Sequence, residues 1–421
     1  MLALSACADD AVRLQGQRID ILTQGLASKT IDVMPSKQGT VTLPAMKRNK
    51  LWPQKGFTAS RRGDHLFWHR DYEVLWKRDI SDGDAHTLTS PPVVARESVF
   101  VTDEYANVTA FKASNGETLW TRELLDDADH VGISGGIAYS NNILYVTTGF
   151  FSIFALDATT GETLWTSMVS TPARAAPTVI GDTLLILTID NQLIALNKKN
   201  GQLLWSHLGI VEDIAMLGSA TPSANSTIAV AAYSSGEVFA LKLSNGAEFW
   251  NDTLVHQQQE GKALPVSDII ASPVIGDNAV YVVSANGNMV AFDVRSGNRL
   301  WERAIPSNQT PWLSGDYLFT IIGNTKIAAI DKKDGHAVWV KSLPSTLNND
   351  PDQEVHWHGP LVVSHSVLIM SSYGSIRRYH AADGRSYREE NLLYEPLFLP
   401  PVVSNGVLYV LTGEGTLAAI R

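Results

Sequence analysis

The histidine pair His356 and His358 is the arrangement in this sequence that best suits metal binding. The two imidazoles are two residues apart, so on a β-strand they would point to one face and could bind one metal ion together. The sequence does not identify a third residue that would bind the same metal ion. We therefore favour hydrogen bonding at the surface or between neighbouring sheets for this pair, and we expect no metal site.

Two acidic runs, residues 126–129 and 350–354, could bind Ca²⁺ through their carboxylates. Neither run has the glycine and the ligand spacing of an EF-hand loop, so we expect both to be solvated loops. No other set of residues indicates a catalytic group or a bound cofactor. We therefore expect a protein that is not an enzyme and holds no cofactor.

Cys7 is the only cysteine of the chain, which excludes an intrachain disulfide and a cysteine-rich metal site. Leu4-Ser5-Ala6-Cys7 has the form of a bacterial lipobox, whose cysteine is lipidated after cleavage. Six residues precede Cys7, too few for the charged and apolar regions of a signal peptide. We interpret residues 1–7 as the remnant of a lipoprotein signal, expect a longer native N-terminus and predict lipidation of Cys7. A chance match in a cytosolic protein is the alternative.

The balance of charges limits the possible partners. The 421 residues carry 43 acidic and 33 basic side chains, a formal net charge of −10, and no Lys/Arg cluster long enough to follow a phosphate backbone. Nucleic acid is thereby disfavoured. The same balance argues against adsorption on anionic lipid, and no stretch approaches the roughly 20 apolar residues of a transmembrane helix. Membrane attachment would have to be covalent or through another protein.

The elements that would position these residues follow from an internal repeat. Residues 155–165 begin with alanine, have glycine six residues later and end with tryptophan four residues after the glycine. The pattern recurs at 110–120, 195–205, 240–250, 291–301 and 329–339. Its glycines recur about every 45 residues, the period of a four-stranded propeller blade. The glycine suits a turn with positive φ, and we expect the tryptophan on the outer strand, between neighbouring blades.

The number of fourth strands predicts eight blades and a closed ring. Six tryptophans end the regular copies, and Arg388 occupies the tryptophan position of a seventh, degenerate copy. An eighth fourth strand stands early, at 74–77, while its three partner strands lie within 400–420. The two ends of the chain would thus complete one blade together. We predict an all-β, eight-bladed β-propeller of four-stranded antiparallel blades over residues 65–421. A tether over residues 8–64 would precede it, with residues 51–54 against the propeller.

The repeat, written Ala-x-Asp-x-x-x-Gly-x-x-x-Trp, resembles the one shared by quinoprotein dehydrogenases and the BamB family, from about residue 66 to the C-terminus. The lipobox, the tether and the stretches 218–222 and 266–274 favour the BamB family. That resemblance implies a non-enzymatic scaffold lipoprotein of the β-barrel assembly machinery at the periplasmic face of the outer membrane. Its implied partners are the periplasmic (POTRA) domains of BamA and nascent outer-membrane proteins, and it would be a monomer within a hetero-complex.

The resemblance also implies which residues bind the partner. In the family, the surface that meets BamA includes a Leu-x-Leu-Arg-Gly loop and an Asp-x-Asp loop. The sequence has Ile214-Ala215-Met216-Leu217-Gly218 and Asp268-Ile269-Ile270 at these places, so an arginine and a carboxylate are both replaced by apolar residues. We expect Ile214, Met216, Leu217, Asp268 and Ile270 to bind the partner mainly by apolar contact. Ordinary blade packing is the alternative for Ile214, Met216 and Ile270.

Two other functions stay open. The repeat would also fit a dehydrogenase that uses pyrroloquinoline quinone, but the site of such an enzyme usually includes a vicinal disulfide, a Ca²⁺ ion and an aspartate base, and this sequence has no second cysteine. A periplasmic scaffold for another partner, such as a cell-wall enzyme, is the third interpretation, because a fold does not determine a function without a site.

Overall fold

The computed structural model describes residues 39–80, 90–125, 135–211, 220–254, 269–285, 287–347, 350, 352–387, 389–391, 393 and 395–421. All of these residues belong to the single compact unit Val33–Arg421. The described part of the chain is built from β-strands and contains no α-helix. It accordingly contains no helix long and apolar enough to cross a membrane.

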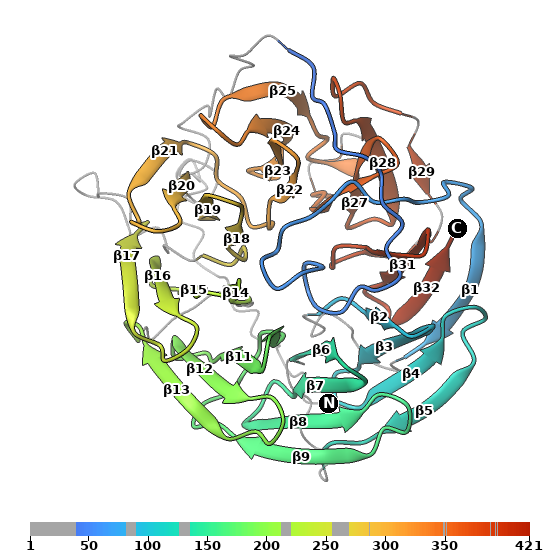
Figure 1. The fold of residues 1–421 in the computed structure, drawn as a ribbon. Coiled ribbons are helices and arrows are strands. Elements are labelled where there is room, and N and C mark those ends of the chain that lie inside the picture. Colours follow the sequence, from blue (N-terminus) through green and yellow to red (C-terminus); the bar gives the residue numbers. More distant parts are fainter. Residues whose placement is uncertain are drawn as a thin grey trace, which may run out of the picture. The chain divides into compact units, whose positions relative to one another are not determined.

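Within this unit, the described strands form eight four-stranded antiparallel sheets, which follow one another around a ring (Figure 1). We number these blades 1 to 8. Blades 1 to 4 consist of β2 Val93–Ala95, β3 Ser98–Thr102, β4 Val108–Lys112 and β5 Thr118–Arg122; β6 Gly136–Ser140, β7 Ile143–Thr147, β8 Ser152–Asp157 and β9 Thr163–Met168; β10 Thr178–Ile180, β11 Thr183–Leu187, β12 Gln192–Asn197 and β13 Leu203–Leu208; and β14 Ser223–Ala224, β15 Ile228–Ala232, β16 Glu237–Lys242 and β17 Glu248–Thr253. Blades 5 to 8 consist of β18 Val274–Ile275, β19 Ala279–Val283, β20 Met289–Asp293 and β21 Arg299–Arg303; β22 Trp312–Ser314, β23 Tyr317–Ile322, β24 Lys326–Asp331 and β25 Ala337–Ser342; β26 Trp357–Val363, β27 Ser366–Ser371, β28 Ser375–His380 and β29 Glu390–Asn391; and β30 Val402–Ser404, β31 Val407–Leu411, β32 Thr416–Ile420 and β1 Val74–Asp79.

Blade 8 joins the two ends of the propeller. Its sheet has the order β1-β32-β31-β30, with Trp76 of β1 opposite Ala419 of β32. In Figure 1 the C-terminus lies beside β32 and β1. The prediction of eight four-stranded antiparallel blades, with the N- and C-terminal strands in one blade, is therefore confirmed.

The central strands of each blade are continuous apolar runs. All five residues of β15 are buried, and β11 buries every residue after Thr183. A strand with neighbouring blades on both of its faces must be apolar at every position, whereas a strand with one solvated face alternates. The fourth strands of blades 1 to 5 instead bury or half-bury their tryptophan and expose most of their other residues.

Each repeat tryptophan packs against the repeat glycine of the next blade. A Cβ atom placed on Gly201, whose φ is +71°, would lie 2.7 Å from Cε3 of Trp165. Only glycine therefore leaves room for the indole at this turn. The contact recurs as Trp76–Gly116, Trp120–Gly161, Trp165–Gly201, Trp205–Gly246, Trp250–Gly297, Trp301–Gly335 and Trp339–Gly384. All seven indoles also donate a hydrogen bond from Nε1 to a backbone carbonyl of the next blade, over 2.9–3.3 Å.

The seam between blades 7 and 8 is closed in another way. Blade 8 has no hairpin between its third and fourth strands, because these come from opposite ends of the chain. Position 388, where the repeat of blade 7 has arginine, lies outside the described residues. Trp68 fills this seam: it is fully buried, its backbone bonds the Ser364 hydroxyl of blade 7, and its Nε1 donates to the carbonyl of Ile420 in blade 8 at 3.4 Å.

Trp68 ends a segment that meets every blade in turn. Residues 52–68 contact the first strand, or in blade 8 the turn that follows it, of each blade in chain order; Figure 1 shows this segment in blue inside the ring. The contacts are Trp52–Val94, Gln54–Ala138, Gln54–Val179, Ala59–Ala224, Ser60–Ile275, Arg62–Leu313, Leu66–Val363 and Trp68–Gly406. We call residues 52–68 the inner segment. Because first strands have an unpaired inner edge, the inner segment covers backbone groups that the blades leave open.

The tryptophan–glycine contact predicts unequal effects of two alanine substitutions in blade 3. Gly201→Ala and Gly181→Ala both place alanine at positive φ, +71° and +55°, which costs about 1–2 kcal/mol. A Cβ on Gly181 meets nothing within 4 Å, whereas one on Gly201 strikes Trp165. We expect Gly201→Ala to lose roughly 1–3 kcal/mol more, measured by urea unfolding with curves of equal slope. Equal losses would contradict the role assigned to this contact.

The seam between blades 7 and 8 gives a second prediction. If Trp68 replaces the missing tryptophan–glycine contact, Trp68→Ala should destabilise the protein about as much as Trp76→Ala at the next seam. Both side chains are buried, and truncation of a buried tryptophan typically costs roughly 3–5 kcal/mol. The measurement is again the urea unfolding midpoint. A loss below about 1 kcal/mol for Trp68→Ala alone would show that other contacts close the seam.

Candidate partner-binding face

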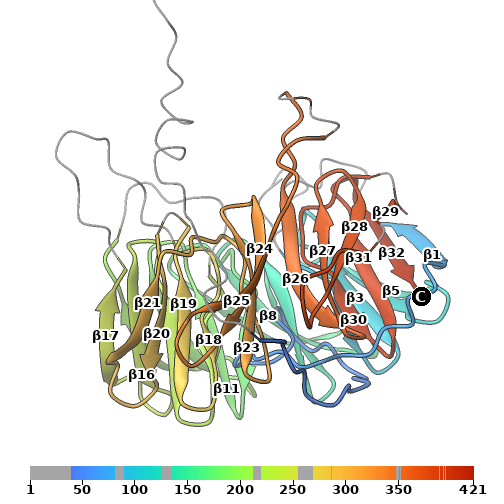
Figure 2. The ribbon, with the colours of Figure 1, turned by 90° about the horizontal axis from the view of Figure 1, so that it is seen from above.

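The two faces of the ring carry different connections. One face carries the turns between first and second strands and is crossed by the inner segment, drawn blue along the lower edge in Figure 2. The opposite face carries the connections from the fourth strand of one blade to the first strand of the next. We call it the connection face; the link from β25 to β26 rises from it in Figure 2.

The residues expected to bind a partner belong to two neighbouring links of the connection face. Ile214, Met216 and Leu217 lie between β13 and β14, and Asp268 lies between β17 and β18, all outside the described residues. Ile270 is described and is half-buried, beside the buried Ile269, which belongs to the core between blades 4 and 5. The structure therefore places Ile270 where its link enters blade 5.

The C-terminal ends of these two links are bonded to each other. The backbone N–H of Thr221 donates to the hydroxyl of Ser272 at 3.0 Å, and the hydroxyl of Ser223 donates to the carbonyl of Pro273 at 2.5 Å. Thr221, Ser223 and Ser272 are all buried, so these bonds are shielded from water. The structure thus holds the starts of blades 4 and 5, and the ends of both links, side by side.

The N-terminal end of the first link is also anchored. The buried side chain of Asn191 donates to the carbonyl of Ile210 at 2.7 Å, and Glu237 of blade 4 accepts from the Ile210 backbone N–H at 2.7 Å. The side chains of Ile210 and Val211 nevertheless stay 61% and 57% exposed. Sequence analysis did not single out this exposed apolar pair. The lack of a polar residue from Leu208 to Val211 was the signal that could have found it.

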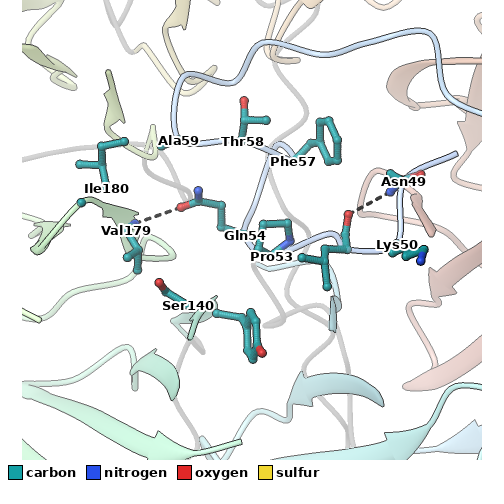
Figure 3. Close-up of a pocket in the computed structure, with 13 residues that line it drawn as sticks. Asn49, Lys50, Pro53, Gln54, Phe57, Thr58, Ala59, Ser140, Val179 and Ile180 are labelled. Carbon is teal, nitrogen blue, oxygen red and sulfur yellow. Dashed lines mark hydrogen bonds between the residues drawn. The ribbon is translucent and has the colours of Figure 1, made fainter. Parts of the chain in front are cut away.

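The face crossed by the inner segment has a hollow of about 550 Å³ beside blades 2 and 3 (Figure 3). It is lined by residues 49–51, 53–54, 57–59, 139–140 and 179–181. Here the oxygen of the Gln54 side chain accepts a hydrogen bond from the backbone N–H of Val179 at 3.0 Å, drawn as a dashed line between these two residues in Figure 3. The lining contains no His, Asp, Glu or Cys; its polar side chains include those of Lys50, Thr58, Tyr139 and Ser140.

The histidine pair at the start of β26 does not form a metal site with other described residues. His356 is exposed and lies 3.5 Å from the side-chain amide of Asn324, whereas the Nε2 atom of His358 is shielded from solvent near Phe398. Among the residues that the structure describes, no three His, Cys, Asp or Glu side chains converge. Of the acidic runs, 126–129 lies outside these residues, and the Asp350 carboxylate accepts bonds from Asp352 and Gln353 within its own turn.

The sequence of the propeller matches a known family. The model of the family described as outer membrane protein assembly factor BamB matches residues 58–131 and 106–341. The chain belongs to the BamB family.

Curated relatives agree with this assignment. The BamB of Vibrio cholerae is 33% identical over 236 residues, which are 56% of this chain and 61% of that protein. The BamB of Yersinia pestis is 26% identical over 240 residues, 55% of this chain and 61% of that protein. The chain thus spans about three fifths of the length of the curated BamB relatives that it matches.

This chain shares its fold with solved structures of BamB and of quinoproteins. BamB from Moraxella catarrhalis superposes with a TM-score of 0.70 at 17% identity and covers 83% of this chain and 99% of its own. The quinohemoprotein alcohol dehydrogenase of Comamonas testosteroni gives 0.65 at 14% identity and covers 89% of this chain and 81% of its own. The fold therefore does not distinguish the BamB family from quinoproteins; the sequence match does.

Three histidines of this BamB-family chain predict how its stability depends on pH. Burial lowers the pKa of His65, His207 and His358. The pKa of His358 falls to about 4, because burial and the nearby His356 both lower it. His65 also accepts the backbone N–H of His365 on Nε2 and faces the carbonyl of Pro44 with Nδ1, a pairing that requires the neutral ring. As the pH falls below about 6.5, these side chains become protonated in the unfolded chain while they stay neutral in the folded protein.

The free energy of unfolding should therefore have its full value above about pH 6.5 and decrease as the pH drops towards 4. His358→Leu removes one of these groups and should make the fall shallower by at most about 1.4 kcal/mol per pH unit. Unfolding by urea at a series of pH values from 7.5 to 5 is the measurement, with the unsubstituted chain as reference. Parallel curves for the two proteins would show that His358 does not carry this dependence.

Proposed function

We propose that this chain is a non-enzymatic scaffold lipoprotein of the β-barrel assembly machinery. It binds the periplasmic (POTRA) domains of BamA and assists the folding and insertion of outer-membrane proteins. The observation that carries this proposal is the match of the BamB family model across residues 58–341.

The proposed binding face is the part of the connection face where blades 3, 4 and 5 meet. It comprises Ile214, Met216, Leu217, Asp268 and Ile270. The bonds from Thr221 to Ser272 and from Ser223 to Pro273 support it, because they hold the ends of both links together so that one partner can meet residues of both. The exposed side chains of Ile210 and Val211 extend the apolar surface towards blade 3. A few central apolar contacts usually supply most of the energy of such an interface.

The proposed location is the periplasmic leaflet of the outer membrane, with a lipid on Cys7 as the anchor. Residues 1–7 would be the remnant of the signal and residues 65–421 the propeller. Residues 8–64 would be the tether, whose last part, from residue 52, lies along the blades as the start of the inner segment. The net charge of −10 supports a covalent anchor, since an acidic surface is not attracted to anionic lipid. In this arrangement the chain is a monomer within a hetero-complex. Mass spectrometry of the full-length protein isolated from membranes should find Cys7 lipidated, and an unmodified Cys7 would contradict this proposal.

Native co-purification from membranes tests the proposed function directly. BamA should be recovered with this chain when the complex is extracted in mild detergent. Recovery of a cell-wall enzyme instead of BamA would favour the interpretation as a scaffold for another partner. Retention of a quinone absorbance by the purified protein would favour the quinoprotein dehydrogenase.

The binding face gives a prediction with purified components. Met216→Glu and Leu217→Glu should each weaken binding of the BamA periplasmic domains by more than about 2 kcal/mol, because a charge would enter an apolar contact. Asp268→Ala should cost less than either, and added salt should weaken binding only slightly. Titration of the domains against each variant measures the effect.

Leu300→Glu is the matched control for these variants, because Leu300 is an exposed apolar residue of β21, the fourth strand of blade 5, and belongs to neither link. It should bind like the parent. If Met216→Glu and Leu217→Glu also bind like the parent while their unfolding midpoints are unchanged, the partner or the face has been assigned wrongly.

A further inference from the structure

The hollow beside blades 2 and 3 has walls that are mainly apolar (Figure 3). Its volume of about 550 Å³ lies within the range of roughly 300–1,000 Å³ that is usual for small-molecule sites. The side chains that make it apolar are those of Leu51, Pro53, Phe57, Ala59, Val179 and Ile180. A ligand that fills this hollow must therefore present an apolar body to most of the lining.

Two hydrogen-bonding groups of the lining already have partners in the protein. The Gln54 side chain accepts a bond from the backbone N–H of Val179, and the carbonyl of Pro53 accepts one from the backbone N–H of Tyr139 at 2.6 Å. A sugar or a peptide backbone needs several donors and acceptors, and these two groups are not free to supply them. An acyl chain needs none, so it suits the apolar walls better.

A buried lysine lies behind this lining. Lys198, in the turn that follows β12 of blade 3, is 9% exposed, and its Nζ lies 3.4 Å from the hydroxyl oxygen of Ser140, which lines the hollow. Ser140 ends β6 of blade 2, so the lysine side chain crosses the seam between the two blades. An ammonium group has three donors, and no carboxylate among the described residues pairs with this one. A buried cation in this state lacks compensation for its lost hydration.

The corresponding lysine of blade 6 has a different partner. Lys332 also stands three residues before the repeat glycine, and its Nζ pairs with Asp316 of its own blade at 2.9 Å. Blade 3 has the equivalent carboxylate in Asp182, since the backbone N–H groups of Lys198 and Lys332 bond to the carbonyls of Asp182 and Asp316. Asp182 pairs instead with Lys199, at 3.5 Å. The Lys198 side chain thus extends away from the carboxylate of its own blade and towards the hollow.

This end of the hollow suits an anion. The Ser140 hydroxyl accepts a bond from Lys198, and no described residue accepts one from Ser140, so its proton is available to a ligand. A nearby charge strengthens such a bond. Lys50 adds a second, exposed cation to the lining, which contains no carboxylate that would repel an anion.

We propose that this hollow binds an amphiphile that consists of one anionic head and an acyl chain. The chain lies against the apolar walls, while the head accepts a hydrogen bond from Ser140 and compensates the charge of Lys198. Carboxylate and phosphate heads share this chemistry, so the test distinguishes a fatty acid from a lipid phosphate. The inference does not rest on the proposed function, because the hollow lies on the face opposite the connection face.

The test is isothermal titration calorimetry of the whole protein with dodecanoate, dodecyl phosphate, dodecyl maltoside and acetate, the amphiphiles below their micelle-forming concentrations. At least one of the two anionic amphiphiles should bind, and the tighter one identifies the source of the ligand. Dodecyl maltoside has the chain without the charge, and acetate has the charge without the chain. Both should bind at least about tenfold more weakly. Equal affinity for either of them, or no binding of the anionic amphiphiles, overturns the proposal.

Lys198→Met removes the charge but keeps an apolar side chain of similar length in the seam. It should weaken binding of the tighter anionic amphiphile by about tenfold or more, because a bond supported by the charge is lost. Lys332→Met is the matched control, since it makes the same change at the same place of the repeat, away from the hollow. This variant should bind within about twofold of the parent.

Leu51→Glu is a second variant that does not disturb the seam, because Leu51 is 42% exposed in the lining. It places a like charge beside the anionic head and should also weaken binding by about tenfold or more. Unchanged binding in Leu51→Glu, or in Lys198→Met with the unfolding midpoint of the parent, overturns the proposal. Equal weakening by Lys332→Met does the same. Weakening by Lys198→Met and Leu51→Glu alone supports it, whether or not the BamA domains bind.

Discussion

The contact between a tryptophan on one blade and a glycine on the next is the constraint on which the ring depends. A four-stranded blade with apolar faces cannot be stable alone, because both faces need a neighbour. The indole supplies a large apolar surface, and the absence of a Cβ on the glycine, as at Gly201 below Trp165, lets that surface approach the turn. The hydrogen bond from Nε1 to a carbonyl of the same turn then determines the orientation of the ring. Repetition of this contact sets the position of each blade relative to the one before it.

The place where the contact is missing explains the course of the N-terminal chain. Blade 8 is made from both ends of the propeller, so it has no third-to-fourth hairpin to receive a tryptophan from blade 7. Trp68 supplies a tryptophan from the other direction, immediately before β1. The inner segment that leads to it has by then contacted all eight blades in order. Neighbouring blades contact each other, and the inner segment connects all of them in addition. Opening of any single seam therefore costs more free energy.

This architecture divides the surface into regions with different uses. One face is crossed by the inner segment, and the rim consists of fourth strands, most of which carry charged residues. The connection face carries the links between blades, and the buried bonds at Thr221 and Ser223 fix the C-terminal ends of two of them. Binding residues on loops held by a rigid scaffold are the usual arrangement for recognition.

The sequence by itself determined the number of blades, the position of each tryptophan and glycine, and the blade shared by the two ends. These features repeat, and a repeated residue type such as the glycine at 201 marks a local turn geometry that no other residue adopts as easily. The sequence also indicated the two links expected to bind a partner, although the residues Ile214, Met216, Leu217 and Asp268 lie outside the described part of the chain. Only the tertiary structure decided the course of residues 52–68 and the role of Trp68 at the last seam. The inner segment pairs largely through backbone N–H and C=O groups, which every residue except proline carries, so its partners leave no signature in the side chains.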